Sequence, residues 1–139
     1  FFEGTVVSIG RGTANPFKVF GHPKYTGGNY SFTPRPVKGV SEDPPLNGQL
    51  CYGQYLGAAA DKLKQQGKIE LSWLLQAYKN LGSKTDFFIP YFEKLAGTNI
   101  LRQQIISGKS ETEIRKSWQA GIDSFKKVRK KYLLYPDFE

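Results

Sequence analysis

Several kinds of residue are scarce in this chain of 139 residues, and each shortage excludes a class of protein. Cys51 is the single cysteine, so an intramolecular disulfide is impossible. His22 is the single histidine, and one cysteine with one histidine cannot supply the ligand set of a structural zinc ion. The composition therefore predicts neither a disulfide framework nor a zinc-stabilised fold.

The chain also has no methionine and no long apolar run. A membrane-spanning helix needs roughly 18–20 consecutive apolar residues, so we expect no membrane span. The first residues, FFEGT, lack the basic region and apolar stretch of a signal peptide. A start on Phe1 and Phe2 without an initiator methionine is typical of a mature product or of a piece of a longer protein, so we expect a preceding N-terminal part.

Acidic residues are in deficit, with 12 Asp and Glu against 20 Lys and Arg, and the net charge of +8 favours anionic partners. The densest basic cluster, KKVRKK at 126–131, follows acidic Glu111 and Glu113 along one expected helix, which is the distribution that the helix dipole favours. A nucleic-acid binder should show a recognition-helix pattern, paired aromatic strand motifs or a zinc framework, and none is visible. We therefore expect no nucleic-acid partner.

The two halves of the chain predict different secondary structure. Ten of the fifteen glycines and six of the eight prolines precede residue 58, where short β-prone runs alternate with turn-forming clusters. Strands are expected at Thr5 to Ile9, Tyr30 to Thr33 and Leu50 to Leu56, separated by long loops of the kind that often carry function. We expect one α+β domain over residues 1–139, with short strands and long loops first and a helical layer in the C-terminal half.

After Gly57 the apolar residues recur at spacings of three and four, which indicates amphipathic helices. The expected helices run from Glu70 to Leu81 with Gly82 as the C-cap, from Asp86 to Ala96 with Pro90 inside, from a Thr98 cap to Gly108, and onward from Ser110. Ser110 and Glu113 form a capping-box pattern. Along the last helix an apolar stripe is predicted to belong to the core: Ile114, Trp118, Ile122, Phe125, Val128 and Tyr132.

The glycine-rich stretch EGTVVSIGRGTANPF suggests an anion-binding turn around Arg11. A phosphate-binding P-loop needs a Gly-Lys-Ser/Thr ending, and the dinucleotide fingerprint needs a third glycine or alanine three positions after the second. Here Gly10 and Gly12 are followed by Asn15 and Pro16 instead. The spacing therefore argues against phosphate binding at a helix N-terminus.

Catalytic groups are few. We expect Cys51 in a strand and His22 in a loop. A nucleophilic Cys–His pair is therefore possible, but the sequence favours a buried cysteine with a structural role. Glycosidases need two carboxyl groups across a sugar cleft. Glu3 is the one acid in the glycine-rich segment, and no second acid stands out. Any glycosidase built on this chain would therefore need a further catalytic group from elsewhere.

The chain resembles a known family in several segments: EGTVVSIGRGTANPF, YSFTPRPVKG, NGQLCYG, FFIPYFEKLAGTNILRQQIISGKSETEIRKSW and FKKVRKKYLLYPDF. In this order they are similar to the C-terminal part of the bacterial domain-of-unknown-function family 1343. That family is known as the exo-acting β-N-acetylmuramidases, glycoside hydrolase family 171. The resemblance covers nearly the whole chain.

The resemblance implies a substrate and different roles for two domains. In the family a Rossmann-like N-terminal domain precedes the C-terminal domain, the active site lies in the cleft between them, and the catalytic acid belongs to the N-terminal domain. The substrate is the non-reducing terminal N-acetylmuramic acid of peptidoglycan fragments. No metal or organic cofactor is implied, and a periplasmic or extracellular location is expected. The catalytic residues of this chain stay unknown.

Arg11 is the residue that the resemblance makes most interesting, because N-acetylmuramic acid carries a lactyl carboxylate. A guanidinium can bind a carboxylate through two parallel hydrogen bonds. Gly10 and Gly12 would allow close approach of the backbone at positive φ, and Thr5 and Thr13 would offer hydroxyls to sugar oxygens. The remaining candidate residues for substrate binding are Glu3, which could orient Arg11, and Tyr52, which could stack on a sugar.

A structural alternative accompanies each assignment. The Gly-Arg-Gly turn could be a tight connection in which Arg11 pairs with Glu3. The hydroxyls of Thr5 and Thr13 could serve local turns. Tyr52 is better explained as a core residue than as a surface for stacking on a sugar. At the level of function, the alternative is a non-catalytic module that binds cell-wall polymers or anionic glycans through its basic face.

Overall fold

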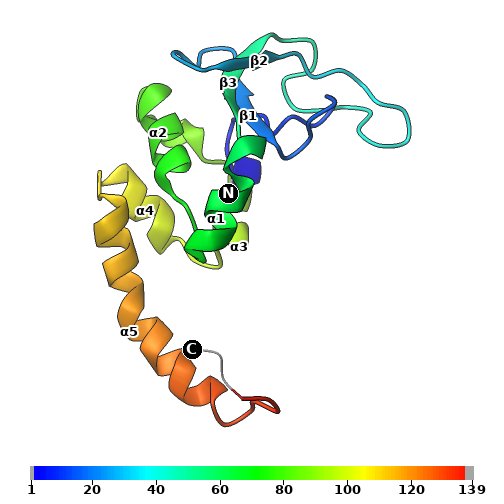
Figure 1. Ribbon diagram of the computed structural model, residues 1–139. Coiled ribbons are helices and arrows are strands. Elements are labelled where there is room, and N and C mark those ends of the chain that lie inside the picture. Colours follow the sequence, from blue (N-terminus) through cyan, green and yellow to red (C-terminus); the bar gives the residue numbers. More distant parts are fainter. Residues whose placement is uncertain (1, 137–139) are drawn as a thin grey trace.

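The computed structural model describes residues 2–136 and has an α+β fold, which confirms the predicted class (Figure 1). Phe1 and residues 137–139, which include the last two residues of the KYLLYPDF segment, lie outside the described residues. Three short strands, β1 (Val19–His22), β2 (Tyr30–Phe32) and β3 (Cys51–Tyr55), form an antiparallel sheet in the order β1-β3-β2. The helical elements are η1 (Phe2–Gly4), η2 (Gly57–Ala59), α1 (Ala60–Gln66), α2 (Ser72–Asn80), η3 (Thr85–Phe87), α3 (Tyr91–Ala96), α4 (Ile100–Ile106) and α5 (Glu111–Arg129).

The sheet separates two apolar clusters, because successive side chains of a strand point to opposite faces. Val19 and Cys51 face a small cluster that includes Leu46 of the long loop between β2 and β3. Phe20 faces the main core, where it meets the helices. The members of that core that lie in or directly next to the helical elements are Leu71, Leu74, Ala77, Tyr78, Phe87, Phe88, Phe92, Leu101, Ile105 and Ile114. The helical layer is thus packed on one face of the sheet, as the sequence predicts.

The first predicted strand is wrong. The segment Thr5 to Ile9 makes two isolated bridges, Thr5 with Phe88 and Ser8 with Gly21, in place of a continuous strand. The Thr5 hydroxyl accepts a hydrogen bond from the Val7 amide at 3.2 Å, and such local side-chain bonds turn the backbone away from an extended ladder. The sequence pattern misses β1, which forms because β3 offers it a pairing partner along its whole length. His22 therefore ends a strand and does not lie in a loop.

The predicted helix from Asp86 to Ala96 is wrong in its first half. Phe88 is extended, with φ −95° and ψ 130°, and α3 begins only after Pro90. Pro90 disfavours helical geometry at Ile89, the residue before it, and Phe88 forms an isolated antiparallel bridge with Thr5 near the start of the chain. Helix α1 was not predicted, whereas α2 lies inside its predicted range. None of the helices that the structure describes is both long and apolar enough to cross a bilayer.

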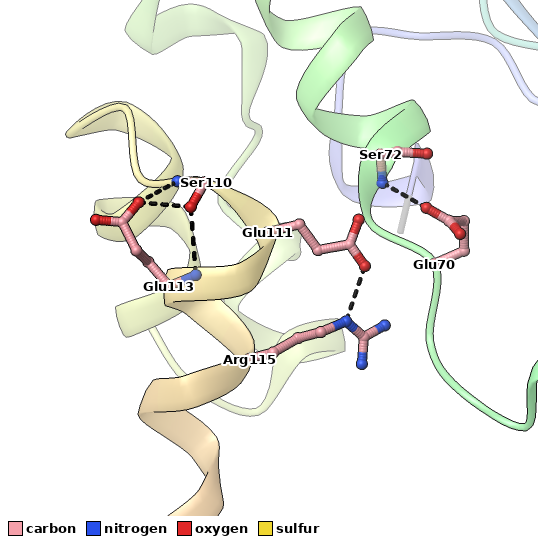
Figure 2. Close-up of polar contacts among 6 residues, drawn as sticks. All are labelled: Glu70, Ser72, Ser110, Glu111, Glu113 and Arg115. Carbon is pink, nitrogen blue, oxygen red and sulfur yellow. Dashed lines mark hydrogen bonds and ion pairs between the residues drawn. The ribbon is translucent and has the colours of Figure 1, made fainter.

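The predicted capping box at the start of α5 is confirmed (Figure 2). The Ser110 hydroxyl accepts from the Glu113 amide at 3.3 Å, and the Glu113 carboxylate accepts from the Ser110 amide at 2.8 Å. Hydrogen bonds from the Ser110 side chain and backbone lower the pKa of Glu113 from its ordinary value. Two side chains three positions apart in the sequence therefore define where this helix begins.

Replacing Ser110 by alanine should lower the free energy of unfolding by about 1 kcal/mol, because the first turn of α5 loses the side chain that caps its amides. Urea denaturation of the wild type and the variant would measure the difference. Ser124→Ala is the matched control, since Ser124 is exposed within the same helix and caps nothing at its start. Equal losses in both variants would show that the capping box contributes nothing.

The predicted core stripe of α5 is wrong beyond its first two turns. Ile114 is buried and Trp118 packs against the main core. Beyond them, Ile122, Phe125, Val128 and Tyr132 are 42%, 64%, 51% and 78% exposed. A helix of 19 residues is about 28 Å long, whereas the seven residues of α4 span about 10 Å. Helix α5 therefore extends beyond the layer that could bury its stripe, as Figure 1 shows.

Candidate functional site

Two distant segments lie side by side and build one wall of the candidate site. The Val6 amide donates to the Phe87 carbonyl, and the Ile89 amide donates to the Gly4 carbonyl, each at 3.0 Å. This short antiparallel pairing places η1 against α3. As a result Glu3, at the start of the chain, lies in the same region as Ile89 and Tyr91.

The glycine-rich turn is held in a conformation that requires glycine. Gly10 and Gly12 both have φ +78°, so the predicted positive φ angles are confirmed. A Cβ at Gly12 would lie 2.4 Å from the Arg35 carbonyl oxygen, which leaves no room for a side chain. The Arg35 amide also donates a hydrogen bond to the Gly12 carbonyl at 2.9 Å. The turn is thereby attached to the long loop after β2, and Arg11 stands exposed at its tip.

Arg11 forms an ion pair with Glu3. The distance from Arg11 Nη2 to Glu3 Oε1 is 2.8 Å, with the side chains 48% and 40% exposed. The Arg11 guanidinium also lies 5.5 Å from the centre of the Phe17 ring. An exposed pair of this kind contributes only about 0–1 kcal/mol, and a guanidinium has several N–H donors. Glu3 therefore orients Arg11 without preventing it from binding a second carboxylate.

The pair stands at the edge of a cleft of about 640 Å³, a volume in the range of small-molecule sites. The lining is mostly apolar, with Glu3 and Arg11 as its charged members, and Tyr91 presents a half-exposed aromatic ring. The other lining residues are Phe2, Thr5, Val6, Val7, Ile9, Pro45, Leu46 and Ile89. An apolar surface beside an arginine suits a ligand that combines an apolar group with a carboxylate.

Both predicted threonines use their hydroxyls in local turns. Thr5 is buried and lines the cleft, and its hydroxyl donates to the Phe2 carbonyl at 2.8 Å. The Thr13 hydroxyl donates to the Gly10 carbonyl at 2.7 Å and accepts from the Asn15 amide at 3.0 Å. These bonds support the geometry of η1 and of the glycine-rich turn. Contact of either hydroxyl with a sugar stays a prediction.

Tyr52 lies apart from the other candidate residues. It is 45% exposed on β3, so its expected place in the core is wrong. Its side chain is on the face of β3 opposite to Cys51, and it does not line the cleft. The structure therefore brings Glu3, Thr5 and Arg11 together on the cleft, with Gly10, Gly12 and Thr13 shaping the adjacent turn, but not Tyr52.

Sequence reasoning named three residues of the cleft and missed the other eight. Four of these eight lie far from the glycine-rich stretch in the sequence: Pro45, Leu46, Ile89 and Tyr91. For Ile89 and Tyr91 a signal exists in the run FFIPYFE, where Pro90 separates an extended segment from a helix start. For Pro45 and Leu46 the local sequence carries no such signal, because their position depends on how the long loop folds back onto the sheet.

A Cys–His nucleophile is not formed. Burial raises the pKa of the Cys51 thiol to about 11, so almost none of it is thiolate at neutral pH. His22 lies on the opposite face of the sheet, and burial, together with the nearby Lys24 charge, lowers its pKa. Cys51 is thus the structural residue that the sequence favours. Within residues 2–136 no group of three or more His, Cys, Asp or Glu side chains is placed to hold a metal ion.

The fold and cleft define an α+β domain with an arginine–glutamate pair at the edge of an open, largely apolar cleft. A family model described as the C-terminal part of the exo-β-N-acetylmuramidase NamZ matches residues 1–135, and the chain belongs to this family. The resemblance drawn from the sequence motifs is thereby confirmed.

Two relatives are much longer than the chain. It is 32% identical to the peptidoglycan β-N-acetylmuramidase NamZ of Bacillus subtilis (strain 168), over 96% of this chain and 35% of that protein. It is similar, with a TM-score of 0.88 and 47% identity, to the crystal structure of a DUF1343 family protein from Bacteroides fragilis NCTC 9343. That superposition covers 98% of this chain and 38% of the Bacteroides chain. The chain therefore spans about a third of the length of these relatives.

Proposed function

We propose that this domain forms the substrate-binding wall of an exo-acting β-N-acetylmuramidase that releases N-acetylmuramic acid from the non-reducing end of peptidoglycan fragments. The observation that carries the proposal is the place of Arg11, exposed at the edge of the cleft and oriented by Glu3 at 2.8 Å. The family to which the chain belongs supports the choice of substrate.

The chemistry of the substrate suits the composition of the cleft. The lactyl group of N-acetylmuramic acid joins a methyl group to a carboxylate. In the proposal Arg11 binds the carboxylate through charge-assisted hydrogen bonds, and the apolar lining accepts the methyl group. Tyr91 offers an aromatic face to the sugar ring.

The proposal assigns the chemical step to the remainder of the full-length enzyme. Among the described residues that line the cleft, Glu3 is the one carboxylate, and it is engaged by Arg11. Hydrolysis of a glycoside by the usual mechanism uses two carboxyl groups that flank the bond. In this proposal the preceding part of the enzyme supplies catalytic carboxyl groups, and this domain completes the binding site. Because peptidoglycan lies outside the cytoplasmic membrane, we place the enzyme in the periplasm or outside the cell.

The proposal is tested by comparing this chain with the full-length enzyme on a chromogenic muramide. The full-length enzyme should release N-acetylmuramic acid, whereas the 139-residue chain alone should not. In a parallel calorimetric titration of the full-length enzyme, N-acetylmuramic acid should bind more tightly than N-acetylglucosamine, which lacks the lactyl group. Equal turnover by the chain alone, or equal affinity for both sugars, would contradict the proposal.

A second candidate function is a non-catalytic module that binds anionic glycans through charge, and the net charge of +8 favours it. The same titration at two salt concentrations separates the two functions. A binder that depends on its basic surface should lose affinity steeply as the salt concentration rises. A shaped cleft should instead keep its preference for the lactyl group at both concentrations.

A further inference from the structure

The last turns of α5 and the residues just after it present an exposed apolar surface, which we define as the α5 stripe: Ile122, Phe125, Val128 and Tyr132. Ile122, Phe125 and Val128 recur at spacings of three, so they share one side of the helix, and Tyr132 follows the end of α5 at Arg129. Each is at least 42% exposed, and Phe125 is 64% exposed. Scattered exposed apolar residues are ordinary on a protein surface, but a continuous row of large side chains marks an interaction site.

The direction of the stripe is set by firm contacts at the start of α5. Gln104 of α4 donates to the Ser117 hydroxyl at 2.8 Å, and Ile114 is fully buried in the main core. Within α5 itself, the Glu111 carboxylate accepts from Arg115 Nε at 2.8 Å, which supports the first turns of the helix (Figure 2). The contacts of Ser117 and Ile114 with the rest of the domain fix the helix axis, and the later turns extend from the domain along that axis. The stripe is therefore presented in a defined orientation.

Gly121 lies on the same side of α5 as the stripe, four residues before Phe125. A glycine inside a helix costs roughly 1 kcal/mol relative to alanine. A Cβ at this position would meet no atom within 4 Å, so nothing within the domain requires glycine here. A glycine on this side of the helix allows another backbone to approach α5 closely.

We infer that the α5 stripe packs against the part of the full-length protein that precedes this domain. The family model describes a C-terminal region. The match to this chain spans only 35% and 38% of the length of the two relatives. The superposition on the Bacteroides protein covers 98% of this chain, so the domain that carries α5 occurs there attached to a much longer polypeptide. A partner in the same chain has a high effective concentration and needs only a modest surface to stay bound.

The charge around the stripe specifies the chemistry of the partner surface. Lys126, Lys127 and Arg129 lie in the last turns of α5, and Lys130 and Lys131 follow directly after it. A partner should therefore present an apolar groove for Phe125 with acidic side chains at its edge, since opposite charges at the rim favour docking. Attachment at α5 would also set the position of the cleft relative to the rest of the enzyme.

Amide hydrogen exchange on the full-length protein tests the inference. In the wild type, the amides of residues 119–129 should be protected by docking. Phe125→Glu places a charge in the apolar contact and should speed exchange across these amides by tenfold or more. Exchange in β3, Cys51–Tyr55, should stay unchanged in the same experiment, which shows that the domain remains folded.

Ala120→Glu is the matched control, because Ala120 is exposed on the side of α5 away from the stripe and the change adds the same charge. It should leave the exchange of residues 119–129 as in the wild type. The inference is overturned if Phe125→Glu behaves like Ala120→Glu. It is also overturned if light scattering shows a wild-type dimer that Phe125→Glu converts to a monomer, because the stripe would then bind a second copy.

Discussion

Arg11→Ala in the full-length enzyme should lower kcat/KM for muramide hydrolysis by roughly 30- to 150-fold. This corresponds to a loss of about 2–3 kcal/mol of transition-state stabilisation, the range for a hydrogen bond to a charged group. The physical reason is the contact that we propose between the guanidinium and the lactyl carboxylate. The loss of the Glu3 ion pair adds little, because both side chains are exposed. Steady-state kinetics on a chromogenic muramide would measure the effect.

Arg102→Ala is the matched control for this experiment. Arg102 also pairs with a glutamate, Glu93, and the exposed fractions of these two side chains are similar, at 36% and 38%, but neither lines the cleft. Its replacement should leave kcat/KM unchanged. A substrate that lacks the lactyl carboxylate should show little difference between wild type and Arg11→Ala. Unchanged muramide kinetics in a folded Arg11→Ala enzyme would remove Arg11 from the site.

Ile114→Ala should lower the free energy of unfolding of the domain by about 2–5 kcal/mol. Ile114 is fully buried where α5 meets the main core, and truncation there removes apolar contacts and leaves a cavity. Chemical denaturation followed by circular dichroism would measure the loss. This is the largest effect on stability that we expect from a single apolar truncation in α5.

Ile122→Ala is the matched control, since it is the same substitution two turns further along the predicted stripe. Ile122 is 42% exposed, so its truncation in the 139-residue chain should change the free energy of unfolding by no more than about 0.5 kcal/mol. If both variants lost stability equally, the later turns of α5 would be packed and the exposed stripe would not exist.

Local signals were the reliable part of the sequence. The capping box at the start of α5 was predicted correctly because Ser110 and Glu113 satisfy each other across three residues. The positive φ angles of Gly10 and Gly12 were likewise predictable, since a turn of this composition has few alternatives. The lone Cys51 was recognised as structural because it occurs within an apolar, β-prone run.

Sequence predictions were less reliable for structure that depends on a distant segment of the same chain. Thr5 to Ile9 has the composition of a strand but forms two isolated bridges, while β1 forms at Val19–His22 because β3 pairs with it. In the cleft, Glu3 and Arg11 were identified from the sequence, whereas Leu46 and Tyr91 were not. These residues approach one another through the pairing of distant segments and the fold of a long loop, and neither is encoded by local spacing.

The sequence by itself determined the α+β class, the start of α5, the glycine turn around Arg11 and the family to which the chain is similar. The tertiary structure alone decided which apolar residues are buried. Periodicity defines the apolar side of α5, but a side is buried only where another element covers it. The domain covers Ile114 and leaves Phe125 exposed. Burial depends on the length of the layer beneath the helix, which no pattern within the helix can report.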